Sequence, residues 1–350
     1  MKQKNYYRHY RGRRSKGKAA LAAFLVLVIL AAVVVIVMQR NVVYDETGAP
    51  RLEVPWQDEG ENETAPSAEL DLVIQTPAKA TETFYGCSVP VPLNRETWSR
   101  SLRQAQDVWG EQLNTVVVTM KAPGGNVYFD SALAAPGAVQ FLPEETGAAL
   151  EALLSEGSEH ELRAVAVFSC FPDSHAAKSS VDTMGLQDTS GYIFYDSSNG
   201  QWLDPAKAEA RAYLCSLACE VAELGFDELL LSDVTYPVAG NLEGIAYGEG
   251  DRSEHLSLFL EELRAALAPY GVKVSLKLPA EVILAGEDEV SGVRLAELAG
   301  KVDRIFADTT PDGAPALAAA VAAAAETAEF VPVLRDCSPP GGNCLIESDV

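Results

Sequence analysis

The segment that most constrains the fold runs from Trp202 to Pro237 and combines a helix, a glycine stop and a buried strand. Asp204 is suited to cap the helix, Pro205 to occupy its first turn and Gly225 to end it. Apolar residues recur between them at helical spacing, and the apolar run Phe226–Leu231 then predicts a buried strand. A helix that leads directly into a buried strand is typical of an α/β protein with a parallel sheet.

The alternation of strand and helix patterns continues through the chain from residue 82. Strands are expected at Phe84–Val89, Thr115–Met120, Arg163–Phe168, Phe226–Leu231, Val272–Leu276, Val302–Phe306, Phe330–Leu334 and Cys344–Ile346. Helices are expected at Arg95–Trp109, Glu144–Ser155, Pro205–Leu224, Glu254–Leu267, Val293–Ala299 and Ala314–Ala328. Eight parallel strands joined by helices predict a (β/α)8 TIM-type barrel. The last βα unit is expected to be truncated, because too few residues separate the final two strands for a helix.

Three stretches carry a resemblance to a known family. They are Trp202–Glu228 with its WLDP start and LGFDE end, Asn114–Ser131, and more weakly Ala164–Asp173. These stretches resemble the signature of a family of glycoside hydrolase-like proteins that was long described only as a domain of unknown function. The resemblance covers about residues 80 to 350. It implies a (β/α)8 barrel distantly similar to alpha-amylase-like enzymes, acting on a polysaccharide by carboxylate acid/base chemistry.

Two strand ends depart from the family pattern. The family's aspartates fall here on Thr119 and Ser232, and an aspartate, Asp233, stands one position later. In a strand, a shift of one residue reverses the direction of the side chain, unless a bulge restores it. A hydroxyl group cannot take over the role of a carboxyl group as general acid or as nucleophile. The sequence therefore leaves three alternatives open: an active glycoside hydrolase, a non-catalytic carbohydrate-binding pseudoenzyme, and an envelope scaffold with the same barrel.

Polar residues follow the predicted strands at their C-terminal ends, where the loops of a barrel converge. Glycoside hydrolysis commonly uses two carboxyl groups, and Asp233 and Asp173 are the candidate catalytic pair, although Asp173 is equally suited to a turn. Asp308 and Glu281 are further candidates for a missing acid. The residues expected to bind substrate are Lys121, Trp202, Ser232, Tyr236, Lys277, Asp308 and Arg335.

No cofactor is expected, because the chain has neither a P-loop nor a G-x-G-x-x-G after a strand. No metal site is expected either, since no C-x-x-C motif accompanies histidines at ligand spacing. Cys337 and Cys344 flank a turn-rich SPPGGN loop, and a disulfide between them stays an open alternative.

The N-terminal region predicts a membrane anchor. Residues 1–18 carry eight Lys or Arg and no acid, and Ala19–Met38 is an uninterrupted apolar run of twenty residues, long enough to span a bilayer. The basic flank places the N-terminus in the cytoplasm and the C-terminal domain outside it. A cleavable signal peptide is the alternative, although no A-x-A-like site follows Met38. Residues 39–80 are expected to form an acidic flexible tether, and residues 81–350 the barrel.

The charge of the chain narrows the class of partner. All residues together carry 27 Lys or Arg and 50 Asp or Glu, a net charge of −23, and none of the acids lies in the first 40 residues. So acidic a domain is unsuited to nucleic acid. The oligomeric state and the particular glycan stay open.

Overall fold

The fold comes from a computed structural model that describes residues 42–44, 50–52, 83–91, 93–140, 143–159, 161–335 and 342–347. The chain divides into two compact units, Met1–Thr76 and Pro77–Val350. In the first unit, β1 (Val42–Tyr44) pairs antiparallel with β2 (Pro50–Leu52), within the stretch expected to be a tether.

The predicted membrane-spanning helix, Ala19–Met38, lies outside the described residues, as does Cys337 of the possible disulfide. Across the described ranges, no helix combines the length and the apolar character needed to cross a membrane.

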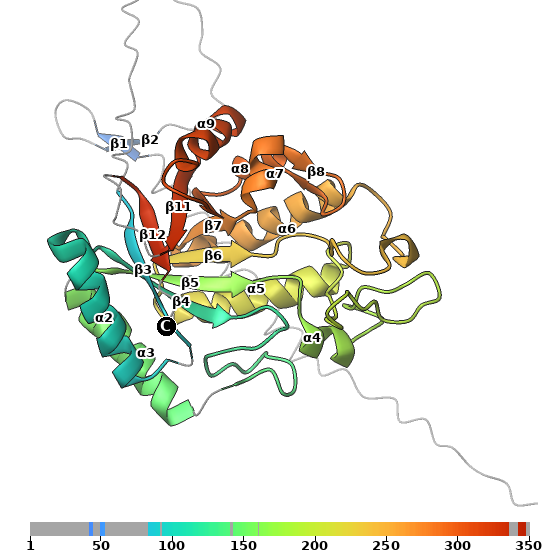
Figure 1. The fold of residues 1–350 in the computed structure, drawn as a ribbon, viewed down its shortest axis with the longest axis horizontal. Helices are drawn as coiled ribbons and strands as arrows, with labels where there is room; N and C mark the ends of the chain where they lie inside the picture. Colours follow the sequence, from blue (N-terminus) through green and yellow to red (C-terminus); the bar gives the residue numbers. More distant parts are fainter. Residues whose placement is uncertain are drawn as a thin grey trace, which may run out of the picture. The chain divides into compact units, whose positions relative to one another are not determined.

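Eight parallel strands form a closed barrel in the second unit (Figure 1). They are β3 (Tyr85–Val89), β4 (Thr115–Lys121), β5 (Arg163–Ser169), β6 (Glu228–Ser232), β7 (Lys273–Lys277), β10 (Arg304–Asp308), β11 (Glu329–Arg335) and β12 (Cys344–Glu347). Each pairs with its neighbour in chain order, and β12 closes the barrel by pairing with β3. The predicted (β/α)8 barrel is confirmed, and both ends of every strand lie within two residues of their expected positions.

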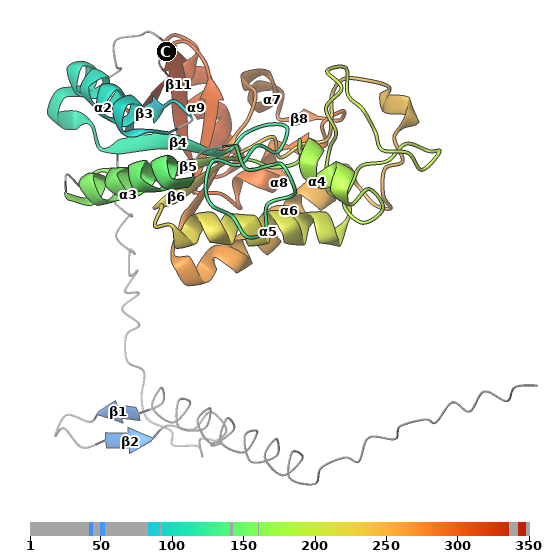
Figure 2. The same cartoon turned by 90° about the horizontal axis from the view of Figure 1, so that it is seen from below.

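Helices cover the outside of the barrel. The longer ones are α2 (Arg95–Trp109), α3 (Pro143–Glu159), α5 (Ala208–Glu223), α6 (Arg252–Leu267) and α9 (Ala314–Ala324), with the shorter α8 (Leu295–Ala299). Figure 2 shows α5 and α6 side by side against the strands. Only residues 336–343 separate β11 from β12, too few for a helix of this kind, in agreement with the predicted truncation.

Smaller elements lie in the connections. They are the helices α4 (Ser174–Ser179) and α7 (Ala280–Ala285), the hairpin of β8 (Glu287–Asp288) and β9 (Val293–Arg294), and the 3-10 turns η1 (Gly110–Gln112), η2 (Leu242–Gly244) and η3 (Ala268–Tyr270). In Figure 1 the arrows of β4, β5 and β6 point toward the loops that carry α4. The longest connection, between β5 and β6, therefore lies partly over the C-terminal end of the barrel.

The segment that leads into β6 differs from expectation at its start. The helix begins at Ala208, and Asp204 instead closes a tight turn before it: Oδ1 accepts from Ala206 N at 2.9 Å, and the carbonyl accepts from Lys207 N at 3.0 Å. The expected helix cap at Asp204 is therefore wrong. The expected stop is confirmed, because Gly225 has a φ of 101°, which favours glycine.

Inward and outward side chains alternate along the strands, as the pleat requires. Outward residues pack against the helices in one large core, and a second core fills the inside of the barrel. The interior core consists of Phe84, Val117, Val165, Leu230, Phe306, Val331, Val333 and Leu345. The barrel is thus filled with packed side chains, as is usual for this fold.

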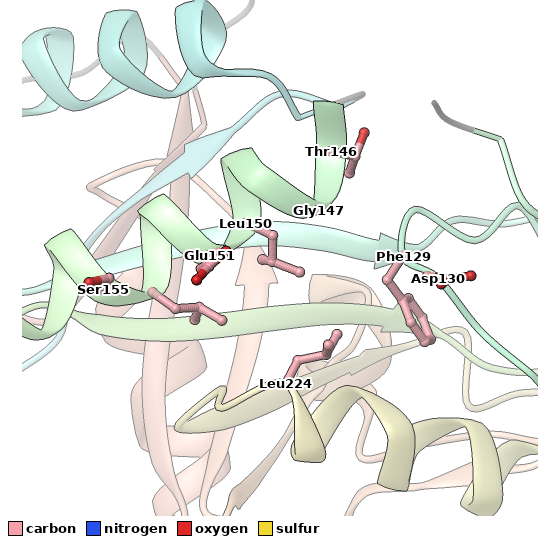
Figure 3. Close-up of a pocket in the computed structure, with 9 residues that line it drawn as sticks. Phe129, Asp130, Thr146, Gly147, Leu150, Glu151, Ser155 and Leu224 are labelled. Atoms are coloured by element: carbon pink, nitrogen blue, oxygen red, sulfur yellow. The ribbon is translucent and has the colours of Figure 1, made fainter. Parts of the chain in front are cut away.

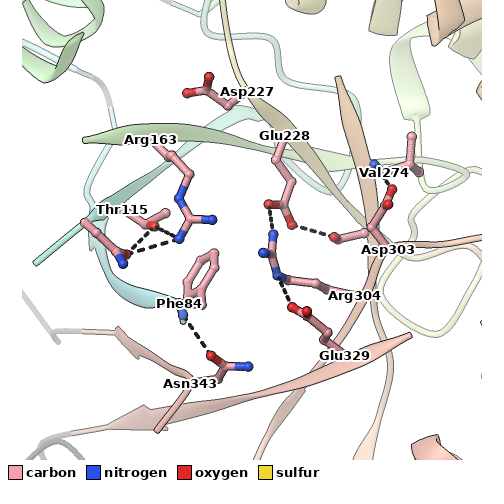
Figure 4. A network of polar contacts seen from close by, with 12 residues as sticks. Phe84, Thr115, Arg163, Asp227, Glu228, Val274, Asp303, Arg304, Glu329 and Asn343 are labelled. Atoms are coloured by element: carbon pink, nitrogen blue, oxygen red, sulfur yellow. Dashed lines mark hydrogen bonds and ion pairs between the residues drawn. The ribbon is translucent and has the colours of Figure 1, made fainter. Parts of the chain in front are cut away.

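Charged side chains seal the N-terminal end of the barrel (Figure 4). The guanidinium groups of Arg163 and Arg304 lie 5.7 and 5.6 Å from the centre of the Phe84 ring. Glu228, buried like Arg304, accepts hydrogen bonds from that arginine and from Ser275. Burial raises the pKa of Glu228, and Arg304 and the Ser275 hydroxyl oppose that shift. Since two buried charges balance each other here, removing one is far more costly than replacing both.

We expect Glu228→Gln to lower the free energy of unfolding by about 3 kcal/mol, because the Arg304 guanidinium then stays buried opposite a neutral side chain. Urea denaturation at pH 7, with an unchanged slope, measures the loss. Glu329→Gln is the matched control: it removes the second carboxylate bound to Arg304, at 3.1 Å, but from a side chain that is 25% exposed. Equal losses in the two variants would contradict this account.

Candidate functional site

A cavity of about 930 Å³ opens at the C-terminal ends of β6, β7 and β10. Its walls come from those strand ends, from α7 and from the β8–β9 hairpin. Its polar and aromatic lining consists of Trp202, Ser232, Asp233, Thr235, Tyr236, Lys277, Glu281, Glu287, Asp288, Ser291 and Asp308. Five of these are carboxylates and one is a lysine, so the cavity is strongly acidic.

Asp233 reaches this cavity because the backbone turns left-handed immediately after β6, at a φ of 57°. In a continuing strand, Ser232 and Asp233 would point to opposite faces, yet both line the cavity. The hydroxyls of Ser169 and Ser232 donate to Asp233 Oδ2 at 2.6 and 2.8 Å, which fixes the carboxylate. A bulge was one way to reorient Asp233; the structure reorients it with a single left-handed residue, a feature that is frequent at functional sites.

Lys277 and Asp308 meet on the far wall of the cavity. Lys277 Nζ lies 3.1 Å from Asp308 Oδ2 and 3.2 Å from Glu347 Oε1, at the end of β12. Arg335 reaches the same Glu347 carboxylate at 3.7 Å, but it is not part of the cavity lining. The sequence analysis missed Glu347 because the predicted strand ended at Ile346. The alternation along β12, with Leu345 inside the barrel, was the signal that Glu347 also points inward.

The two aromatic candidates occupy different positions. Trp202 is half-buried on the cavity wall, and its indole N–H donates to Asp196 Oδ2 at 2.9 Å. Tyr236 also lines the cavity but is fully buried, with its hydroxyl 2.8 Å from His255 Nδ1 and its ring against Tyr247. Trp202 is therefore partly accessible from the cavity, whereas Tyr236 supports its wall.

Asp173 and Lys121 lie away from the cavity in a fully buried ion pair. Lys121 Nζ is 3.0 Å from Asp173 Oδ2 and also donates to the carbonyls of Ser169 and Cys170, at 2.9 and 3.3 Å. The other oxygen of Asp173 caps α4 by accepting from Ala176 N at 2.8 Å. Asp173 was expected to be a second catalytic carboxylate or a turn residue; the structure places it as the N-cap of α4 and pairs its charge with that of Lys121.

The structure thus brings together six of the nine residues that the sequence singled out. These are Trp202, Ser232, Asp233, Tyr236, Lys277 and Asp308. Lys121, Asp173 and Arg335 lie outside the lining.

A second cavity, of about 390 Å³, lies on the outer face of the barrel between α3 and the end of α5 (Figure 3). Leu150 and Leu154 of α3 line it together with Phe129 and Leu224. Asp130 and Glu151 are its carboxylates. It shares no lining residue with the cavity around Asp233.

In the part of the chain that the structure describes, no group of three or more His, Cys, Asp or Glu side chains is arranged to hold a metal ion. The expectation of a site without metal or cofactor stays a prediction.

Asp173→Asn and Asp233→Asn should separate a structural carboxylate from a reacting one. Asp173→Asn leaves the Lys121 ammonium buried without its anion, so we expect it to lower the free energy of unfolding by about 3–5 kcal/mol. Asp233→Asn should change it by less than about 1 kcal/mol, because asparagine tolerates the left-handed region and keeps an acceptor for the two serines. Urea denaturation compares the two variants, and a larger loss in Asp233→Asn would contradict the assignment.

Comparison with solved structures supports the fold. The chain is similar to the glycoside hydrolase domain of PgaB (BpsB) from Bordetella bronchiseptica, at 16% identity over 76% of this chain and 93% of that one, with a TM-score of 0.52. It is also similar to a cycloisomaltooligosaccharide glucanotransferase from Paenibacillus sp., solved with cycloisomaltoheptaose, at 9% identity over 71% and 38% of the two chains and the same TM-score of 0.52. At these identities the likeness shows the barrel alone.

A hypothetical protein from Ruminiclostridium thermocellum shares 20% identity over 55% of this chain and 95% of that one, with a TM-score of 0.45. No match is found among curated proteins. Residues 95–312, well over half of the chain, match the model of a family described as "putative glycosyl hydrolase domain". The chain therefore belongs to this glycosyl hydrolase-like family.

Proposed function

We propose that the barrel binds a polysaccharide in the cavity at its C-terminal end and cleaves a glycosidic bond with Asp233 as the reacting carboxylate. The observation that carries the proposal is the left-handed backbone at Asp233, which turns a carboxylate into a cavity of about 930 Å³. Two serine hydroxyls hold one oxygen of that carboxylate in place. Membership of a glycosyl hydrolase-like family supports the same reaction class.

The second carboxyl group is best supplied by Glu281. Glycoside hydrolysis needs one carboxyl group as nucleophile or base and another that donates a proton to the leaving oxygen. Asp308 is already engaged by the Lys277 ammonium at 3.1 Å, which leaves it less available to a leaving oxygen. Glu281, at the start of α7, lines the cavity, and the described residues include no ion-pair partner for it. We assign proton donation to Glu281 and attack, or activation of water, to Asp233.

The charge of the cavity favours a neutral or cationic glycan. Its five carboxylates face a single lysine, which is already bound to Asp308 and Glu347. A polymer of uronic acids would bring like charges together, and this is costly in a partly enclosed site. A polymer of neutral hexoses, N-acetylated sugars or amino sugars meets no such repulsion.

A non-catalytic carbohydrate-binding barrel is the second candidate function. One observation favours it: the inward-facing end of β6 carries the hydroxyl of Ser232, and the alternation along β4 puts Thr119 on the same face as the interior Val117. If Asp233 only shapes the wall, the cavity binds a glycan without cleaving it.

We expect the intact chain, in detergent micelles, to release reducing ends from a neutral or a cationic hexasaccharide, built from N-acetylglucosamine or glucosamine, more readily than from a galacturonic acid hexamer. Asp233→Asn and Glu281→Gln should each lower kcat roughly 10²–10⁴-fold, as is typical when a catalytic acid or base is lost. Binding of the hexamers, followed by calorimetry, should persist in both variants.

Asp107→Asn serves as the matched control, since this exposed carboxylate lies near the end of α2, away from the cavity. Binding without release by the parent chain would establish the carbohydrate-binding barrel in place of the enzyme. Absence of both binding and release across neutral, cationic and anionic glycans would overturn both functions.

We further propose that the chain is a single-pass membrane protein, with Ala19–Met38 as its anchor and the barrel outside the cytoplasm. The support is the basic stretch of residues 1–18 followed by twenty apolar residues. In bacterial cells the intact chain should sediment with membranes, and protease added to spheroplasts should digest the barrel. Protection of the barrel together with a cytoplasmic marker would contradict this orientation.

A further inference from the structure

Two turns of the same design follow each other in the connection between α4 and α5. They begin at Asp188 and Asp196, and in each the aspartate N–H donates to the carbonyl four residues later, at 2.7 and 3.0 Å. In each, Oδ1 accepts from the backbone N–H groups two and four residues later, at distances of 2.8 to 3.0 Å. The fourth residue is left-handed in both, at Gly191 and Asn199. These bonds account for the turns themselves.

The turns differ in the second carboxyl oxygen. Asp196 Oδ2 accepts the indole N–H of Trp202 at 2.9 Å, whereas the hydrogen bonds that described residues make to the Asp188 carboxyl all end on Oδ1. The turn chemistry does not need this additional bond. The bond ties the Asp196 turn to the indole of Trp202. This indole lines the cavity of about 930 Å³ at the C-terminal strand ends, called the mouth cavity below.

Further contacts hold the Asp196 carboxylate and the Trp202 backbone in place. A Cβ added to Gly200 would stand 2.6 Å from Asp196 Oδ2, so only glycine leaves room for the carboxylate in this position. Burial by itself would raise the pKa of Asp196, but the hydrogen bonds from Trp202, Gly200 and Ser198 lower it below its usual value. The acceptor is therefore charged at neutral pH. The Trp202 carbonyl accepts from Leu186 N at 2.8 Å, which leaves the side-chain torsions as its main freedom.

We propose that Asp196 is a positioning residue, which holds the Trp202 indole as a stacking platform for a pyranose ring on the wall of the mouth cavity. This inference rests on the proposed glycan-binding function. The C–H face of a pyranose carries slight positive charge and packs against the negative face of an aromatic ring. A carboxylate that accepts the indole N–H adds electron density to that ring. It also fixes the ring before the glycan arrives, which reduces the ordering cost of binding.

Acrylamide quenching of tryptophan fluorescence in the intact chain tests the positioning directly. The chain has four tryptophans: Trp56 lies outside the described residues, and Trp98 and Trp109 are only 1% and 4% exposed. The difference between the parent and Trp202→Phe therefore isolates the signal of the half-buried indole of Trp202. Asp196→Ala and Gly200→Ala, the second of which displaces the carboxylate without removing it, should both increase quenching of that signal. Asp188→Ala removes the equivalent turn aspartate and should leave it unchanged. Equal quenching in all three variants overturns the positioning role.

Calorimetry with the glucosamine and N-acetylglucosamine hexamers tests the platform. Asp196→Ala should weaken binding about 2- to 10-fold, the cost of ordering one large side chain on binding, and should raise KM while kcat stays nearly constant. Asp196→Asn, which keeps an acceptor oxygen, should restore part of the affinity, and Asp188→Ala should bind like the parent.

Two outcomes separate this inference from the proposed function. If the parent binds a hexamer and Asp196→Ala, Gly200→Ala and Trp202→Phe all bind it equally well, the platform is overturned while the glycan site stands. If the parent binds neither hexamer, nor any other glycan, the proposed function falls and the platform with it, even where quenching confirms the Asp196–Trp202 contact.

Discussion

The pairing of β12 with β3 is the interaction on which the rest of the structure depends. It places Cys344 opposite Tyr85, and Asn343 accepts a hydrogen bond from Phe84 N at 2.8 Å. Once the barrel is closed, the pleat assigns every strand residue to the inside or the outside. The inside then divides into the charged network around Arg304, the apolar core, and a polar end that faces the loops.

The division between inward and outward positions explains why Asp233 needs a change of backbone direction to reach the cavity. The inward position at the end of β6 belongs to Ser232, and a straight strand would turn Asp233 toward the helices. A single left-handed residue redirects it, at a conformational cost that is smaller for aspartate than for most residues. The two serine hydroxyls on Oδ2 help to offset that cost. Asp233 and Ser232 therefore work as a pair, in which the serine positions the carboxylate that the strand itself does not present.

Much of this fold was predictable, because apolar periodicity and glycine stops are local signals. All eight strands follow from such patterns, and so does the stop at Gly225. The structure departs from the expectations where one residue's backbone or a contact distant in sequence decides the position of a side chain. No pattern shows that Asp173 meets Lys121 inside the protein, because the two residues belong to segments distant in sequence, which also meet where Gly124 N donates to the carbonyl of Pro172 at 2.9 Å. The left-handed turn at Asp233 is likewise a property of the folded chain. The inward position of Glu347, by contrast, could have been predicted by extending the alternation of the last strand by one residue.

A crystal structure of the Asp233→Asn variant of the intact chain with a bound hexasaccharide tests the central claim most directly. The account predicts a sugar ring over the Trp202 indole and a glycosidic oxygen between residue 233 and Glu281, within the cavity at the C-terminal strand ends. A hexasaccharide bound only elsewhere, for example in the outer cavity between α3 and α5, would contradict it.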